Sequence, residues 1–420
     1  MFNKLLRIIK DPDLKRKFFF MFAFLAGFRL LASIPVPGTD VTRLREFLAS
    51  NQLFGLFNIF SGGALDNLSI VMLGVGPYIT GSIIMQLLTM IFPRLKEMYQ
   101  EDGEAGRQKF NQYSRLLTFP LALVQGFGLL TILERQGILH FSFTEKIGAM
   151  IIVSAGSVLL MWIGELVSEY AIGNGVSLLI FAGIVSRFPA GVQRTLATFD
   201  QSQLPTLLSF AVIALITIAA VVVISEGERQ VPVYYAKRVR GMRLYGGMST
   251  HLPLRVNQAG VIPIIFAISI LLFPQMIANY LSTADNAILR AIAAAFINFL
   301  ASPWAYAAAY FILVVVFTYF YTAVTFDPAS ISENLQKSGA FVPGIRPGAP
   351  TSAFLYNIVN RITLVGALFL GIIAVLPVLF RAVSGITTLA VGGTALLIVV
   401  SVVLETAKQV EAQLSLRTYE

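Results

Sequence analysis

Long apolar stretches recur along this chain, and they constrain its fold more than any other feature. A stretch of about 20 predominantly apolar residues is the length that a helix needs to cross the hydrocarbon core of a bilayer. Only 13% of the 420 residues are charged, against about 25% in an average soluble domain. The chain is therefore predicted to be an all-α polytopic membrane protein with ten transmembrane helices. These lie at residues 18–35, 74–92, 116–134, 148–168, 175–189, 206–225, 258–280, 303–325, 362–380 and 384–404.

The residue inventory removes several kinds of chemistry. The chain has no cysteine, so disulfides, thiol catalysis and cysteine-ligated metals are excluded. His140 and His251 are the only histidines, too few for a histidine-based metal centre. No phosphate-binding loop of the form GxxxxGK[ST] occurs, so the chain is not expected to hydrolyse ATP itself. We expect no catalytic residue, no metal and no cofactor.

The distribution of Lys and Arg predicts the orientation, because basic residues accumulate in the cytoplasmic loops of membrane proteins. An N-terminus in the cytoplasm places 22 of the 31 basic residues on that side, six of them in the loop 226–257 and three in the loop 326–361. An even number of spans then puts both termini in the cytoplasm. The net charge of +9 is explained by this topology before any nucleic-acid partner is considered.

Ten spans divide into five plus five. An odd number of spans in each half makes the second half enter the membrane from the opposite side, as in an inverted repeat. We predict an N-terminal half at 1–190, a C-terminal half at 191–405 and a short cytoplasmic tail at 406–420. The openings of spans two and seven support the repeat, because Gly74-Val-Gly-Pro77 and Gly260-Val-Ile-Pro263 are similar strings at corresponding positions. The alternative is that Gly, Val and Pro are simply common in membrane helices.

The segment from Ser61 to Leu73 is amphipathic and too short to span the membrane. At 1.5 Å per residue, a helix of about a dozen residues crosses only about half of a ~30 Å hydrocarbon layer. Polar residues at Asp66 and Asn67 argue against contact with lipid. The segment is either a re-entrant half-helix that plugs a cavity or a helix at the membrane interface.

Ionisable residues are almost absent from the centres of the spans. Arg29 is the exception, and Glu165 and Glu169 lie near a span end. Coupled transporters need buried ionisable groups to bind and relay their ions, whereas an aliphatic constriction can hold back ions by dewetting. The pattern favours a conduit. The alternatives are a small-solute secondary transporter and an insertase scaffold without a pore.

Three polar stretches, at 93–115, 226–257 and 338–348, fall on the predicted cytoplasmic side. Basic loops with interleaved tyrosines suit an RNA surface or an acidic protein partner. The alternative is that these loops only follow the positive-inside rule and touch anionic lipid.

Specific strings in two of these stretches and in the predicted spans resemble the SecY family of bacterial protein-export channels. They are EGERQVPVYYAKR (226–238), LPLRVNQAGVIPIIFA (252–267), SGAFVPGIRPG (338–348), GNGVSLLIFAGIV (173–185) and GPYITGSIIMQLL (76–88). The strings are spread over nearly the whole chain. The resemblance implies a protein-conducting channel that translocates unfolded secretory polypeptides and releases hydrophobic segments laterally into the plasma membrane.

The resemblance also implies site residues and a clamshell of two halves around a pore. The pore ring is expected at Val75, Ile79, Ile180, Val261, Ile265 and Ile398. A re-entrant plug helix at about 61–73 would include Ser61, Gly62, Gly63, Asp66 and Asn67. The polar residues Thr80, Gln125 and Asn257 are expected at a lateral gate.

Partners follow from the same resemblance. Docking of the SecA motor ATPase or of the ribosome and its RNA is expected at Arg238, Arg240, Arg243, Arg255 and Arg346. SecE and SecG would complete a heterotrimer in the membrane lipids. Signal sequences and nascent chains would be the cargo, and the energy would come from the motor or the ribosome.

Overall fold

The computed structural model describes residues 11–37, 58, 61–197, 204–235, 238–240, 243–245, 249–282, 286–384 and 393–417. Each of the ten predicted spans overlaps one long helix. These helices are α2 (Pro12–Ser33), α5 (Gly76–Ile91), α7 (Gly103–Arg135), α8 (Phe143–Tyr170), α9 (Gly175–Ala197), α10 (Leu204–Glu226), α11 (Ile262–Leu281), α13 (Pro303–Thr325), α15 (Ala349–Ser384) and α16 (Gly393–Arg417). The predicted span ten begins at residue 384, and residues 385–392 lie outside the described ranges.

Fewer than ten of these helices meet a strict criterion of length and hydropathy. Among the described residues, six helices are long and apolar enough to cross a membrane. The number becomes seven if α5 and the short helix α6 (Pro93–Gln100), which are bent by 114° at their junction, count as one broken span. The chain is thus a multi-pass membrane protein, and the count of ten spans stays a prediction.

Several helix bounds differ from the prediction because polar sequence extends some helices beyond their apolar part. The loop predicted at 93–115 is mostly helical, since α6 fills its start and α7 begins at Gly103. Helix α15 begins at Ala349, well before the predicted span at 362. Two further helices, α12 (Ala287–Ala301) and α14 (Pro328–Lys337), lie between predicted spans. Asn286 and Asp327 cap these two helices by accepting hydrogen bonds from backbone N–H groups of their first turns.

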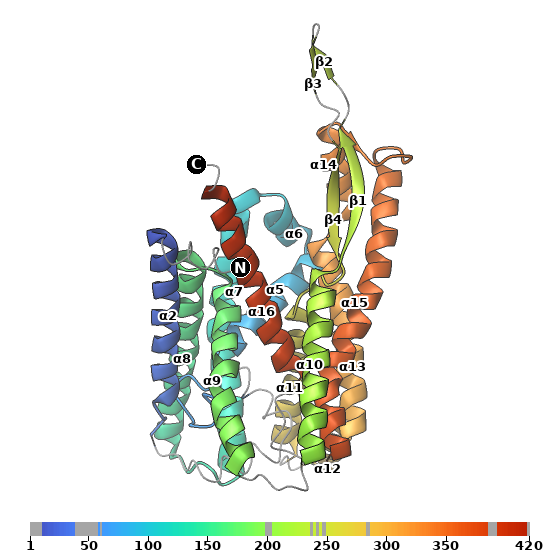
Figure 1. The fold of residues 1–420 in the computed structure, drawn as a ribbon. Coiled ribbons are helices and arrows are strands. Elements are labelled where there is room, and N and C mark those ends of the chain that lie inside the picture. Colours follow the sequence, from blue (N-terminus) through green and yellow to red (C-terminus); the bar gives the residue numbers. More distant parts are fainter. Residues whose placement is uncertain are drawn as a thin grey trace.

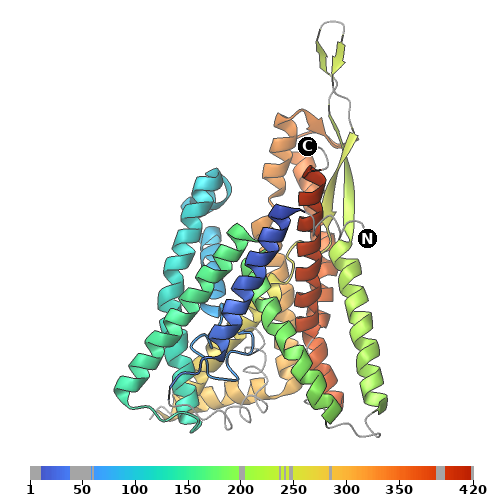
Figure 2. The ribbon, with the colours of Figure 1, turned by 60° about the vertical axis from the view of Figure 1, so that its left-hand side comes forward.

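The helices pack as two groups, one of α2 to α9 and one of α10 to α16 (Figures 1 and 2). The predicted halves at 1–190 and 191–405 stay a prediction. In the first group α7 packs against α5 and α8, and α8 also packs against α9 and α2. In the second group α13 packs against α11 and α15, and α16 packs against α10 and α15. The two groups meet along two seams, one between α9 and α16 and the other between α11 and the pair α5 and α7. This arrangement leaves a central region bordered by helices from both groups.

A small β-sheet qualifies the all-α prediction. Strands β1 (Glu228–Tyr235) and β4 (Ser249–Arg255) pair antiparallel, and β5 (Ala340–Phe341) pairs with the other edge of β1. The sheet therefore joins the two predicted cytoplasmic loops, 226–257 and 326–361. Beyond it, β2 (Arg238–Arg240) and β3 (Arg243–Tyr245) form a hairpin that projects from one end of the molecule (Figure 1). We call this the sheet end, and the opposite end, where α12 lies, the α12 end.

Candidate functional site: an aliphatic cluster between two groups of helices

The six predicted ring residues meet in one hydrophobic cluster. Val75, Ile180 and Ile398 are at most 3% exposed, and the other three are partly buried members of the same cluster, namely Ile79, Val261 and Ile265. Ile79, Ile180, Ile265 and Ile398 lie in α5, α9, α11 and α16, and Val75 and Val261 immediately precede α5 and α11, so both groups contribute. Aliphatic side chains from both groups of helices therefore meet in one cluster. That these residues line a pore stays a prediction.

Four of these side chains lie at the starts of α5 and α11, where the backbone has the same local geometry. Gly74 and Gly260 have φ of 58° and 60°, a left-handed conformation that glycine adopts without a steric cost. Each glycine lies two residues before its helix begins, and a proline follows at the second helical position. The backbone N–H of Ile79 donates to the Val75 carbonyl at 3.0 Å, and that of Ile265 donates to the Val261 carbonyl at 3.4 Å. The matched strings therefore reflect matched structure, which favours the inverted repeat over coincidence.

The predicted plug helix is not helical in this structure. Residues 61–75 form a series of turns, because Gly62 and Gly63 have φ of 72° and 77° and the backbone bonds span three residues, for example from Met72 N–H to the Ser69 carbonyl at 2.9 Å. The segment is still buried, with Leu65 and Leu68 at most 1% exposed. We refer to residues 61–75 as the plug segment.

The five predicted plug residues have different surroundings. Ser61 is buried, and its hydroxyl donates to the Asn58 carbonyl at 3.1 Å instead of capping a helix. Asp66 accepts from the Asn58 side chain at 2.5 Å and forms an ion pair with Arg187. Asn67 is half-buried. The predicted polar residues thus mostly serve internal contacts.

Two of the three predicted gate residues are in contact. The Gln125 amide of α7 donates to the Thr80 hydroxyl of α5 at 3.3 Å, and that hydroxyl donates to the Gly76 carbonyl of its own helix at 2.9 Å. Asn257 lies apart, in the turn before α11, where its Cα lies near Gly366 of α15. Its side-chain oxygen is buried and has no hydrogen-bond partner in the described part of the chain. The three predicted residues therefore do not form one continuous polar gate.

The predicted docking arginines are spread along the sheet end. Arg238, Arg240 and Arg243 lie on the β2–β3 hairpin, with Arg240 directly opposite Arg243. Arg255 is exposed at the base of the sheet, opposite Glu228. The structure does not bring the five together into one patch.

Arg346 lies in an exposed turn whose shape is fixed on both sides. Gly344 and Gly348 have φ of 79° and 95°, and the Thr351 hydroxyl donates to the Arg346 carbonyl at 2.8 Å. A small apolar core that includes Val231, Leu254 and Leu355 holds the sheet against α15. The arginine side chain is thus presented from a firmly packed base.

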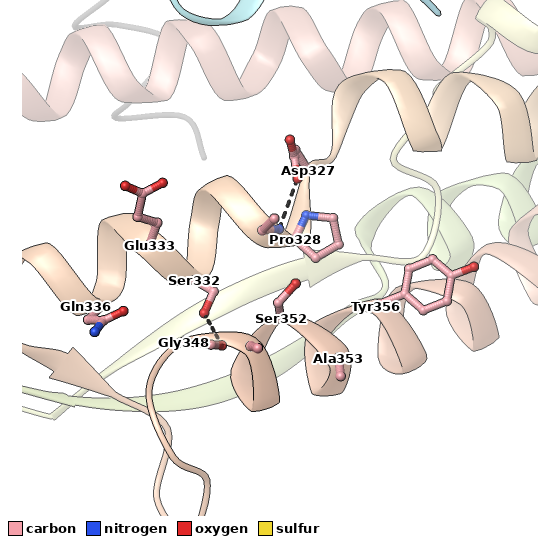
Figure 3. Close-up of a pocket in the computed structure, with 11 residues that line it drawn as sticks. Asp327, Pro328, Ser332, Glu333, Gln336, Gly348, Ser352, Ala353 and Tyr356 are labelled. Atoms are coloured by element: carbon pink, nitrogen blue, oxygen red, sulfur yellow. Dashed lines mark hydrogen bonds between the residues drawn. The ribbon is translucent and has the colours of Figure 1, made fainter.

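A concavity that no sequence pattern indicates lies between α14 and α15 at the sheet end (Figure 3). It has a volume of about 530 Å³ and is lined by Asp327, Glu333, Gln336 and Tyr356 among others. The Ser332 hydroxyl donates to the Gly348 carbonyl at 2.7 Å and fixes one wall. In the described ranges, no group of three or more His, Cys, Asp or Glu side chains is placed to hold a metal ion.

Comparison with known proteins decides the family. The protein-family model for SecY matches residues 69–407. The chain belongs to the SecY family. Among curated relatives, the protein translocase subunit SecY of Corynebacterium glutamicum is 43% identical and covers 100% of this chain and 99% of its own length. That of Thermus thermophilus is also 43% identical, with coverage of 98% and 95%.

Solved structures of SecY-type proteins share the fold. One reported as "The structure of a protein conducting channel" aligns with a TM-score of 0.63 at 21% identity, covering 95% of this chain and 92% of the other. A second, reported as "The plug domain of the SecY protein stablizes the closed state of the translocation channel and maintains a membrane seal", aligns with a TM-score of 0.62 at 20% identity, with the same coverage.

Proposed function

We propose that this SecY-family chain is a protein-conducting channel of a bacterial plasma membrane. It passes unfolded secretory polypeptides between its two halves and releases hydrophobic segments sideways into lipid. The observation that carries the proposal is the meeting of six aliphatic side chains, contributed by both halves, in one buried cluster. An enzyme would need polar reactive groups at such a central site, and the six side chains that meet here are all aliphatic.

The ring suits a cargo of variable shape. Branched aliphatic side chains are stiff at χ1 and make a narrow apolar constriction, which holds back water and ions by dewetting. Such a constriction makes no specific hydrogen bonds, so it accepts any side chain that a passing polypeptide presents. A transporter of small solutes would instead bind its substrate through a fixed set of polar groups.

The side exit is proposed at the seam between α11 and the pair α5 and α7. The Thr80–Gln125 hydrogen bond joins α5 to α7 on one side of this seam, and interhelical hydrogen bonds of this kind contribute only ~0.6–2 kcal/mol. A hydrophobic signal segment that binds the open seam better than the closed one shifts the population toward the open state. The exposed apolar surface of α10, including Leu215 and Val223, suits lipid and the helices of small partners such as SecE and SecG.

The energy for transport is proposed to come from a partner bound at the sheet end. The projecting hairpin with Arg238, Arg240 and Arg243 suits an acidic protein surface or ribosomal RNA. Its basic character also supports an orientation with the sheet end and both termini in the cytoplasm. The partner would be the SecA motor or a translating ribosome.

Reconstitution tests the proposal directly. The chain is inserted into liposomes with its small partner subunits, and an unfolded precursor is offered together with either the motor and ATP or a translating ribosome. The expected result is a precursor that becomes resistant to added protease. A precursor that stays fully accessible under both conditions would contradict the proposal.

A further inference from the structure

The plug segment is anchored mainly to the N-terminal group of helices. Its buried side chains Leu65, Leu68 and Met72 pack into a cluster formed by the end of α7, the α7–α8 turn and the start of α8. Its backbone is joined to the chain after α2, because Val36 N–H donates to the Leu68 carbonyl at 2.8 Å. These apolar contacts fill space, but they do not fix one position as a directed polar contact does.

Two arginines from different helices supply directed contacts to the first turns of the segment. Arg29 of α2 donates from Nη1 to the Gly62 carbonyl at 2.7 Å. Arg187 of α9 pairs through Nη2 with the Asp66 carboxylate. The Asn58 amide donates to the other oxygen of that carboxylate at 2.5 Å. The carboxylate thus has a partner on each oxygen, and the Arg29 charge is satisfied by a backbone carbonyl.

The backbones of α9 and the plug segment approach closely enough to make the ion pair possible. A Cβ placed on Gly183 would lie less than 3.0 Å from the Gly62 Cα, which real Cβ atoms do not tolerate. Gly63 in turn lies directly against the aliphatic part of the Arg187 side chain. The two glycines Gly62 and Gly183 therefore let the chain come near α9, one turn before Arg187.

The environment makes these contacts stronger than ordinary surface pairs. The side chains of Arg187 and Asp66 are 33% and 28% exposed, so most of each is withdrawn from water. A partly withdrawn pair is screened less than an exposed one, and removal of one partner leaves the other charge poorly compensated. Loss of Asp66 would also leave Arg187 and Arg29 as neighbouring positive charges without the carboxylate.

We propose that Arg29 and Arg187 clasp the plug segment to the N-terminal half and so set how readily the channel opens. This inference rests on the proposed function. Contacts made only in the closed arrangement favour that arrangement, so removal of either arginine's contact shifts the population toward the open one. A weaker clasp should let ions leak through the resting channel and let signal segments of lower hydrophobicity open it.

The test compares the resting ion leak of proteoliposomes that contain wild-type or variant channels with their small partner subunits. Arg187→Gln and Asp66→Asn should each raise the leak about tenfold, the factor expected for loss of one charge-assisted hydrogen bond. Arg187→Lys keeps the charge and should stay within about threefold of wild type. The exchange Asp66→Arg with Arg187→Asp should restore most of the seal relative to either charge-removing variant.

A matched control lies nearby. Lys146 of α8 pairs with Glu134 of α7 at 2.6 Å, at the α12 end of the molecule. Lys146→Gln also removes one member of a partly exposed ion pair, and it should leave the leak unchanged. Export of a precursor with a weakened signal segment provides the second readout, which should rise for Arg187→Gln and stay low for Lys146→Gln.

Three results would overturn the clasp. The first is a leak in both charge-removing variants that stays at the wild-type level. The second is a leak in Lys146→Gln that rises as much as in those variants. The third is a failure of the exchanged pair to reseal the channel. In each case the wild-type channel would still export a normal precursor, so the proposed function would stand. Failure of the wild type to export anything would instead count against the function itself.

Discussion

The starts of α5 and α11 are built alike, yet the segments that lead into them are not. Both helices begin two residues after a left-handed glycine, and at each start a Val just before the helix and an Ile within it join the hydrophobic cluster. Before α5 lies the plug segment, buried and bound by Arg29 and Arg187. Before α11 lies a turn that follows strand β4 of the sheet end. The N-terminal half thus carries the plug segment, and the C-terminal half carries the sheet end, the proposed docking platform. Both halves contribute to the aliphatic cluster.

The segments ahead of α5 and α11 also differ in their polar contacts. Asp66, ahead of α5, has partners on both carboxylate oxygens, whereas the Asn257 side-chain oxygen, ahead of α11, is buried without one in the described part of the chain. A buried polar atom without a partner disfavours the arrangement that contains it. The entrance to α11 thus lacks a contact like the ion pair of Asp66 with Arg187 ahead of α5.

Replacement of the ring should break the seal most strongly. Substitution of Ile79, Ile180 and Ile398 by Ser removes the apolar constriction and admits water, so ion leak should rise by on the order of a hundredfold and signal-sequence selectivity should loosen. Single-channel or vesicle conductance measures it. The matched control replaces three isoleucines on the outer surface, Ile151, Ile216 and Ile372. A tight membrane in the ring variant would contradict the ring assignment.

A glycine of α8 that lies directly against the plug segment offers a second way to disturb this segment alone. A Cβ at Gly156 would lie less than 3.0 Å from the Ile70 carbonyl oxygen of the plug segment. Gly156→Ala should therefore displace the plug segment, lower the free energy of unfolding by ~1–3 kcal/mol and raise the ion leak several-fold. Gly148→Ala, on the same helix with no atom within 4 Å of its new Cβ, is the control and should match wild type. Equal behaviour of the two variants would argue against a tightly packed plug.

The seam should respond more weakly. Thr80→Val together with Gln125→Leu removes the hydrogen bond that joins α5 to α7 on one side of the seam, and such a bond contributes ~0.6–2 kcal/mol. Its loss should let these two helices separate from each other more readily where they border α11. Insertion of moderately hydrophobic segments into lipid should rise about threefold, measured by alkaline extraction. Thr131→Val is the control, because its hydroxyl donates to Phe127 of its own helix, at 2.7 Å. A drop in insertion would show that the Thr80–Gln125 contact serves the open state.

Loss of a basic residue at the sheet end should lower export without raising the ion leak. Arg346→Ala removes an exposed charge on a rigid turn, so motor-driven export should fall several-fold while the resting leak stays at the wild-type level. Lys337→Ala, which removes an exposed charge already paired with Glu333 at 2.7 Å, should leave both unchanged. A leak in Arg346→Ala would mean that the two halves do not divide the work as described.

Helices could be predicted from the sequence because a spanning helix is a local property of about 20 apolar residues. Four of the six ring residues, Ile79, Ile180, Val261 and Ile265, lie in the family strings. The structure brings all six into one cluster. The matched glycines Gly74 and Gly260 are visible in the sequence as part of a repeated string.

Contacts between distant residues could not be predicted in the same way. The ion pair between Asp66 and Arg187 joins residues 121 apart, and nothing local to either marks the other. An unexplained acidic residue in a short apolar segment and an arginine near a predicted span end were the only signals. The pairing of β1 with β5 likewise joins two separate loops. The turns of the plug segment depend on left-handed glycines, which composition alone does not distinguish from a short helix.

The central claim is that a polypeptide passes through the aliphatic cluster, and cross-linking tests it most directly. The chain has no native cysteine, so Ile180→Cys introduces a single thiol at the cluster. A precursor with one cysteine, halted midway by a folded domain at its end, should form a disulfide with position 180 under mild oxidation. The control Ile216→Cys, on the outer surface, should not. Cross-links at position 216 and none at 180 would contradict a path through the centre.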